Sequence, residues 1–141
     1  MYNNSDLLFV PLGGSGEIGM NANLYHYEGS WLMVDLGISF PDDSMPGIDV
    51  VLPDLSFIEQ RRDQLAGLVL THGHEDHLGA IPYMWSQLGC PVYGSAFTLA
   101  LLRRKLSENG RQVDIPLIEI GPGSVTAVSY THLTLPTTDR G

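Results

Sequence analysis

The chain is poor in basic residues and in cysteine, and both shortages narrow the functions and cellular locations that we expect for it. It has 141 residues, with 7 Lys and Arg against 16 Asp and Glu, so its formal net charge is −9. A chain this acidic repels nucleic acid unless metal ions or a separate basic surface compensate. Its single cysteine, Cys90, excludes an internal disulfide and favours a reducing compartment, so we expect a cytoplasmic protein.

Long apolar runs are also absent. No segment approaches the roughly 18–20 apolar residues that a membrane-spanning helix needs. The N-terminal MYNNSDLLFV lacks the basic start and apolar stretch of a signal peptide. We therefore expect no membrane partner. The composition is 43% hydrophobic, which suits a globular domain with a core.

The order of the expected elements predicts an α/β layered domain, because a strand hairpin is followed by alternating strands and helices. The expected strands are 6–12, the two arms of a hairpin over 21–37 with its turn at 28–30, 49–52, 66–72, 91–94 and 113–121. The expected helices are 55–65, 78–88 and 95–110, with Asp54 and Ser95 as N-caps of the first and last.

A glycine-rich segment admits two structural interpretations. Residues 14–19, GSGEIG, follow an apolar run, and Asp35 closes a second one, as in the first turn of a dinucleotide-binding fold. That fold needs a helix next, whereas residues 18–24 alternate apolar and polar with the period of a strand. We therefore favour a glycine turn between two strands, with Glu17 in a structural role.

The segment THGHEDHLGA concentrates metal-binding chemistry, because His72, His74, Asp76 and His77 lie within six residues. His72 and His74 are two apart in an extended segment, so their imidazoles point the same way. Two imidazoles suit one zinc, and a carboxylate with an imidazole suits a second. Two metals about 3.5–4 Å apart share a hydroxide that attacks phosphorus or a carbonyl carbon. The alternative is a surface or pH-sensitive histidine cluster.

Several segments together resemble one family. The H-x-H-x-D-H loop after a buried strand is similar to that of the metallo-β-lactamase superfamily. The segments LGGSGEIGMN, VDLGISFPDD, GIDVVLPD and LVLTHGHEDHLGAIPY resemble the start of bacterial ribonuclease J, in the β-CASP group of that superfamily. The resemblance implies that 1–127 form the N-terminal part of a metallo-β-lactamase fold, an αββα sandwich truncated at its C-terminal side.

The resemblance also implies roles for single residues. His72 and His74 are expected to hold one zinc and Asp76 and His77 a second, with Mn²⁺ or Mg²⁺ as substitutes. Asp35 is expected to support the metal loop from behind the ligands. The alternative role for Asp35 is a carboxylate that accepts hydrogen bonds from turn amides.

A second metal site is implied at the segment PGID, which resembles a calcium-binding loop of ribonuclease J. The expected ligands of a structural Ca²⁺ are the Gly47 carbonyl and the Asp49 carboxylate. The alternative is an ordinary solvated loop. We also expect His26 to be half-exposed on its strand, Glu75 to face solvent and 103–105 to form a solvated helix face.

The implied activity is hydrolysis of RNA phosphodiesters by a dizinc-bridged hydroxide, as a 5′–3′ exonuclease, an endonuclease or both, in RNA maturation and decay. RNA would bind through the full-length protein, for which a homo-oligomer is one option. Two alternatives stay open: another hydrolase of this fold acting on a lactone, thioester or β-lactam, and an inactive metal-binding fragment. The isolated chain is expected to be inactive, because the family's remaining metal ligands lie further along.

Residues 128–141 are expected to be a non-native tail. The segment VSYTHLTLPT, at 128–137, matches the translation of a transposon-based sequencing adapter, and the tail lacks a core pattern. We therefore exclude it from the expected fold. His132 falls close to the place of the family's next metal histidine, but we do not assign it as a ligand.

Overall fold

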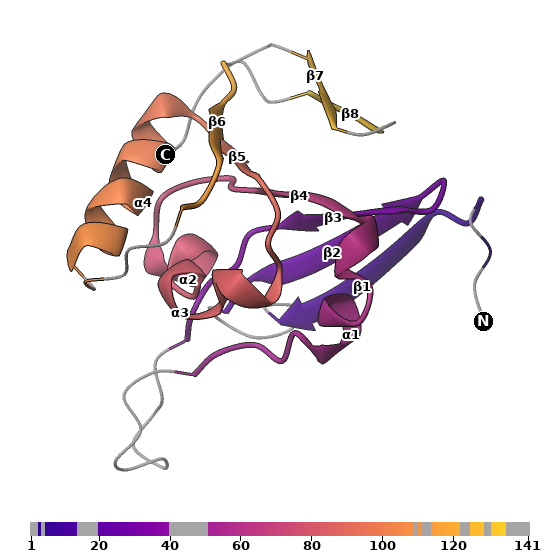
Figure 1. The fold of residues 1–141 in the computed structure, drawn as a ribbon, viewed down its shortest axis with the longest axis horizontal. Coiled ribbons are helices and arrows are strands. Elements are labelled where there is room, and N and C mark those ends of the chain that lie inside the picture. Colours follow the sequence, from indigo (N-terminus) through magenta and orange to yellow (C-terminus); the bar gives the residue numbers. More distant parts are fainter. Residues whose placement is uncertain are drawn as a thin grey trace.

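The fold is a mixed sheet with helices against it, seen in a computed structural model that describes residues 3, 5–13, 20–39, 51–108, 110, 114–121, 125–128 and 131–134. Six strands pair in the order β1-β2-β3-β4-β5-β6, and β7 and β8 form a separate pair (Figure 1). The strands are β1 Leu8–Gly13, β2 Ala22–Tyr27, β3 Ser30–Val34, β4 Leu65–Val69, β5 Val92–Gly94, β6 Leu117–Glu119, β7 Val125–Val128 and β8 Thr131–Thr134. The helices are α1 Ser56–Glu59, α2 Glu75–Leu78, α3 Ile81–Met84 and α4 Ala96–Glu108, with 3-10 turns η1 Arg62–Gln64 and η2 Trp85–Gln87.

The first three strands form an antiparallel meander. β1 pairs antiparallel with β2, and β2 with β3. Glu28 and Gly29 join β2 to β3 with φ values of +52° and +75°, which are typical of a two-residue hairpin turn. A dinucleotide-binding helix after the first strand is therefore wrong, because that stretch of chain forms β2. Residues 14–19, with Glu17, lie outside the described part of the chain.

The other half of the sheet is parallel and creates the edge at which the predicted ligands meet. β3 pairs parallel with β4, β4 with β5, and β5 with β6. The carboxyl ends of these strands therefore lie at the same edge of the sheet. Asp35 follows β3 directly, and 70–77 follow β4, so two distant segments emerge side by side.

Apolar side chains on both faces of the sheet account for its layered structure. On one face, Trp31 and Met33 of β3 belong to a buried cluster with residues from all four helices, which lie along the sheet in Figure 1. On the other face, Leu32 belongs to a smaller buried cluster with Val69 and Tyr93. The predicted α/β class is thereby confirmed.

The helix predicted over 78–88 is wrong, because this stretch divides into α2, α3 and η2. Pro82 has no N–H to continue a helical ladder. The Ala80 N–H, which would bond the Asp76 carbonyl in a continuous helix, donates instead to the Leu36 carbonyl at 3.1 Å. Bonds to the end of the sheet thus replace bonds within the helix.

Other expected elements differ mainly in length. The helix predicted over 55–65 shortens to α1 and η1, and the Asp54 carboxylate accepts the Ser56 N–H at 2.9 Å. The helix predicted after Ser95 is confirmed as α4, with the Ser95 hydroxyl accepting the Thr98 N–H at 3.2 Å. Of the strand predicted over 49–52, Val51 forms a single bridge.

Two predicted features lie at or beyond the limits of the described residues. Gly47 and Asp49, the predicted calcium ligands, fall in 40–50, which lie outside them. At the start of the predicted tail, the backbone of β8 pairs antiparallel with that of β7, which lies almost entirely before the tail, and Ala127 is opposite His132. The non-native origin of 128–141 stays a prediction.

His26 corrects the expectation of a half-exposed strand residue, because it is buried. Its Nδ1 lies 2.8 Å from the Asp6 carbonyl, and its ring lies 4.8 Å from that of Trp31. The hydrogen bond attaches the segment before β1 to the core. The contacts with Asp6 and Trp31 therefore bury an imidazole that the sequence pattern had predicted to be half-exposed.

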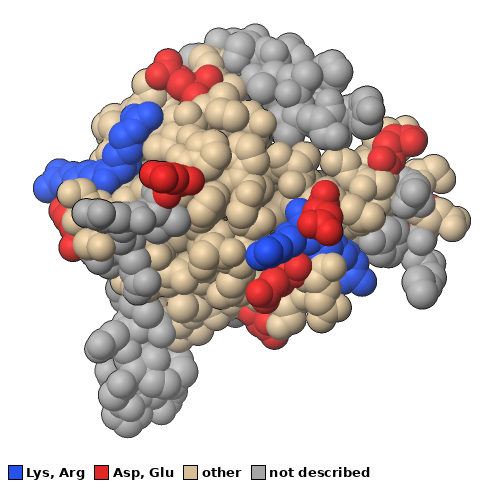
Figure 2. All heavy atoms as spheres, viewed as in Figure 1, with Lys and Arg blue, Asp and Glu red and all other residues tan. Residues whose placement is uncertain are grey.

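Charge is unevenly distributed on the face drawn in Figure 2. Lys and Arg gather over α4 and near α1, in both places close to Asp or Glu. This face thus presents mixed charge rather than a broad basic surface. In the described ranges, no helix has the length and apolar character needed to cross a membrane.

Replacing Gly37 by Ala should destabilise the fold. An added Cβ would lie 1.8 Å from the Asp76 carbonyl oxygen. To relieve this clash, the backbone at Asp76 would have to move together with the segment after β4. We expect the free energy of unfolding in urea to fall by about 1–3 kcal/mol. Gly121→Ala is the matched control, since its added Cβ meets nothing within 4 Å. Equal stability of the two variants would contradict the prediction.

Candidate metal centre

The buried carboxylate of Asp35 joins the ends of β3 and β4. Its residue has φ of +65°, a left-handed conformation that Asp tolerates better than most residues. Its Oδ1 accepts the Thr71 N–H at 2.8 Å, and its Oδ2 accepts the Thr71 hydroxyl at 2.7 Å. The Asp35 N–H donates to the Val69 carbonyl at 2.8 Å. Backbone and side chain of one residue thus hold the start of the metal loop, residues 71–77.

The same carboxylate orients His77. Nδ1 of His77 lies 2.8 Å from Oδ2 of Asp35. A carboxylate accepts but does not donate, so this contact assigns the proton to Nδ1 and leaves the lone pair on Nε2. Nε2 lies 3.5 Å from Oδ2 of Asp76. His77 therefore presents a metal-binding nitrogen beside a carboxylate oxygen.

The donor atoms gathered here fit a metal ion. Among the described residues, His72, Asp76 and His77 offer ligand atoms that all lie within 4.8 Å of one another. Bonds of 2.0–2.1 Å in a tetrahedral site place neighbouring ligands about 3.4 Å apart. The 3.5 Å between His77 and Asp76 agrees with that spacing. Nitrogen and carboxylate donors suit zinc or a similar divalent metal.

His74 lies next to this group without joining it. Its ring is edge-on to that of His72, with 4.9 Å between centroids, whereas the rings of His72 and His77 are 3.6 Å apart. His74 directly precedes α2 in an extended conformation. The structure thus brings together the donor atoms of three of the four predicted ligands, with His74 beside them. Their division between two ions stays a prediction.

Burial and neighbouring charges shift the pKa values of two histidines in opposite directions. Burial alone would lower the pKa of His77, but the hydrogen bond and charge of Asp35, with the charge of Asp76, outweigh it and raise that pKa. Burial lowers the pKa of His72, and the charge of His77 lowers it further. His72 is therefore the more readily available as a neutral imidazole.

Two residues outside the predicted set also shape this loop. Thr71 donates twice to Asp35, and Asn21 donates to the Asp76 carbonyl through its backbone N–H at 3.0 Å and through Nδ2 at 2.9 Å. Thr71 adjoins His72, and Asn21 closely follows the glycine-rich segment. These positions in the sequence carried no chemical signal of their own.

On the outer side of the loop, the expectation for Lys105 is corrected. Its ammonium group bonds Glu75 and its side chain is only 19% exposed, whereas the Glu75 side chain, predicted to face solvent, is 42% exposed. The predicted solvated face of α4 is confirmed for Arg104, which is 77% exposed and pairs with Glu108. A long-range ion pair thus connects α4 to the loop.

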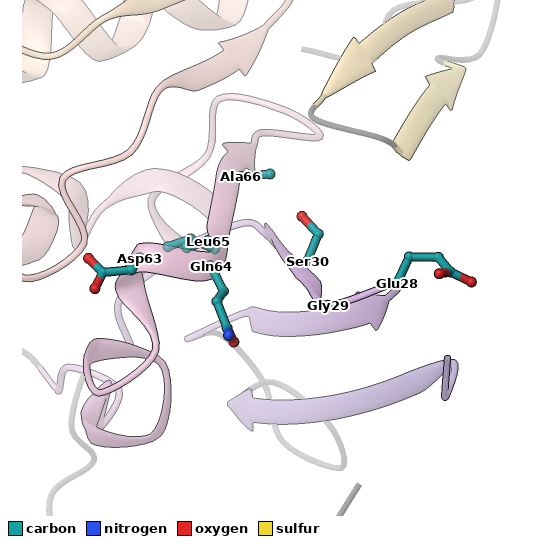
Figure 3. Close-up of a pocket in the computed structure, with 7 residues that line it drawn as sticks. All are labelled: Glu28, Gly29, Ser30, Asp63, Gln64, Leu65 and Ala66. Atoms are coloured by element: carbon teal, nitrogen blue, oxygen red, sulfur yellow. The ribbon is translucent and has the colours of Figure 1, made fainter. Parts of the chain in front are cut away.

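Two surface hollows lie near described parts of the sheet. One is lined by residues of the β2–β3 turn, η1 and the starts of β3 and β4 (Figure 3), which are the opposite ends of these strands from the metal loop. The other lies between the loop and α4, and its lining includes Gly73, Glu75, Leu101 and Lys105. The histidine cluster is therefore separate from the first hollow and borders the second.

Comparison with known proteins connects this geometry to a family. Residues 16–136 match the metallo-beta-lactamase superfamily. The chain is 42% identical over 144 aligned positions to Ribonuclease J of Sinorhizobium meliloti, covering 94% of this chain and 26% of the relative. It is 43% identical over 111 positions to Ribonuclease J 2 of Staphylococcus aureus, covering 79% and 20%. The chain thus spans about a quarter or less of these relatives.

Solved structures share the fold at low identity. A B3 metallo-beta-lactamase with an active-site glutamic acid superposes with a TM-score of 0.56 at 18% identity, over 88% of this chain and 47% of that one. The Rm3 metallo-beta-lactamase gives a TM-score of 0.56 at 18% identity, over 93% and 51%. At these identities the likeness shows the fold alone, and it confirms the predicted metallo-β-lactamase architecture.

Replacing Asp35 by Asn should lower the pKa of His77, because the substitution removes a charge that raises it. An NMR titration of the metal-free chain measures this pKa. In the wild type, protonation of His77 adds to the free energy of unfolding. This contribution is complete below the ordinary pKa of 6.5, and it is lost as the pH rises through the raised pKa of His77 in the folded chain. Asp63→Asn, at the far end of β4, is the control. An unchanged pKa in Asp35→Asn would contradict the assignment.

Proposed function

The chain belongs to the metallo-beta-lactamase superfamily, and from this premise we propose that it forms part of a zinc-dependent ribonuclease that hydrolyses RNA phosphodiesters. The observation that carries the choice of substrate is its similarity, over most of its length, to relatives named ribonuclease J. The donor set of the metal loop supports the choice of a hydrolytic metal enzyme.

We assign the metal ligands as His72 and His74 for one ion and Asp76 and His77 for the other. Bound zinc would supply Lewis acidity, by activating water as a nucleophile and by neutralising charge on the phosphate. Asp35 keeps the proton of His77 on Nδ1 and so keeps Nε2 available. Burial lowers the pKa of His72, which favours its neutral imidazole.

The acidity of the chain is compatible with this substrate. Its formal charge of −9 opposes the approach of RNA, and two dications at the loop would offset part of it locally. The longer protein would supply further contacts with RNA. A cytoplasmic location, a homo-oligomer and a structural Ca²⁺ at Gly47 and Asp49 belong to the same proposal.

Zinc binding to the chain tests the centre directly. We expect isothermal titration to show binding, and His77→Ala and Asp76→Ala to weaken it at least about tenfold. His132→Ala is the matched control, because we assign no metal to that histidine. Unchanged affinity in both ligand variants would reject the centre, and weakened binding in the control would reject the exclusion of His132.

Activity requires the context of a longer protein. We expect the chain alone to leave RNA intact. Placed in the matching segment of the Sinorhizobium meliloti relative, it should support metal-dependent RNA cleavage, which His72→Ala abolishes. Linear RNA labelled at either end, compared with circular RNA, separates exonucleolytic from endonucleolytic cleavage. A folded chimera that binds zinc but cleaves no RNA would contradict the proposed function.

A further inference from the structure

The carbonyl of Asp76 accepts two hydrogen bonds from one distant residue. Asn21 donates its backbone N–H at 3.0 Å and its side-chain Nδ2 at 2.9 Å to this oxygen. In a continuous helix the oxygen would accept the Ala80 N–H, which donates to the Leu36 carbonyl instead. Asn21 therefore replaces a helical bond with a tertiary one at the peptide of a proposed metal ligand.

The same amide lies close to a second proposed ligand. Nδ2 of Asn21 lies 3.4 Å from Nε2 of His77, the nitrogen that carries the lone pair when the imidazole is neutral. This distance is long for a hydrogen bond, so the bond to the Asp76 carbonyl is the stronger one. Asn21 itself is partly buried, which limits the competition of water for its amide.

Gly37 also approaches the carbonyl of the Asp76 peptide. Gly37 packs so closely against it that an added Cβ would lie 1.8 Å from its oxygen. The Gly37 N–H donates to the Asn21 carbonyl at 2.9 Å. The Asp76 peptide is therefore contacted by Asn21, which directly precedes β2, and by Gly37, which follows β3.

We propose that Asn21 is a positioning residue for the metal ligands Asp76 and His77, an inference that rests on the proposed metal centre. The Asp76 side chain is 41% exposed, so its own packing restrains it little. The position of its backbone determines where the short side chain can place the carboxylate. By holding this peptide, Asn21 keeps the carboxylate beside Nε2 of His77, where both atoms reach one ion.

The inference predicts an effect on one metal rather than two. Within the described residues, the side-chain hydrogen bonds of Asn21 go to Asp76 and His77. We expect Asn21→Ala to weaken one zinc-binding event about 10–100-fold and to leave the other unchanged. Titration calorimetry with Zn²⁺ measures both events, and the visible absorption of bound Co²⁺ reports the geometry of each.

Asn23→Ala is the matched control, because Asn23 is the same residue type on the adjacent strand β2 and pairs with Val34 rather than the metal loop. We expect it to bind both metals like the wild type. Urea unfolding of the metal-free variants separates positioning from stability. The proposal would be overturned if Asn21→Ala lost zinc affinity equally at both metals, in proportion to a lower urea midpoint. Unchanged zinc affinity in Asn21→Ala would also overturn it.

A metal-free measurement distinguishes failure of this inference from failure of the centre. If the wild-type chain binds no zinc, the proposed centre fails for this chain. The ring ¹⁵N shifts of His77 then test Asn21 alone. A change in these shifts in Asn21→Ala, with those of His26 unaffected, would support the positioning role, and identical His77 shifts in both proteins would overturn it.

Discussion

The buried Asp35 carboxylate is the interaction on which the rest of the site depends. Burying a charge is costly unless hydrogen bonds replace its hydration. Here the Thr71 N–H, the Thr71 hydroxyl and Nδ1 of His77 all approach within 2.8 Å. The same contacts join β3 to the segment after β4 and orient a proposed ligand. Stability and metal chemistry therefore share one carboxylate.

Around this carboxylate, the backbone of the metal loop is hydrogen-bonded to the segments next to β2 and β3. The carbonyls of Glu75, Asp76 and His77 accept the N–H groups of Ile38, Asn21 and Leu36 at 2.8–3.0 Å. At Asp76 the bond from Asn21 takes the place of a helical bond, whereas the Glu75 carbonyl also keeps its helical bond from the Gly79 N–H at 2.8 Å. The helix ends after four residues. The long-range bonds also fix the backbone of two proposed ligands against the rigid end of the sheet, which favours a site already shaped for its metal.

Local patterns predicted the elements whose bonds are local. The alternation in β2 and the Ser95 cap of α4 are examples, because both depend on neighbours within a few residues. The helix predicted over 78–88 failed because the Ala80 N–H bonds Leu36 across the fold. His26 and Lys105 were misplaced for the same reason, since the Asp6 carbonyl and Glu75, 20 and 30 residues away, are their hydrogen-bond partners.

The sequence by itself determined the chemical nature of the site, because H-x-H-x-D-H supplies nitrogen and carboxylate donors at ligand spacing whatever surrounds them. It also indicated the family through its flanking segments. Only the tertiary structure decided which of these donor atoms lie close enough together to hold one ion. Asp35 and His77 are 42 residues apart, and Asn21 and Asp76 are 55 apart. Contacts of that separation exist only once the parallel strands have placed their ends at one edge of the sheet.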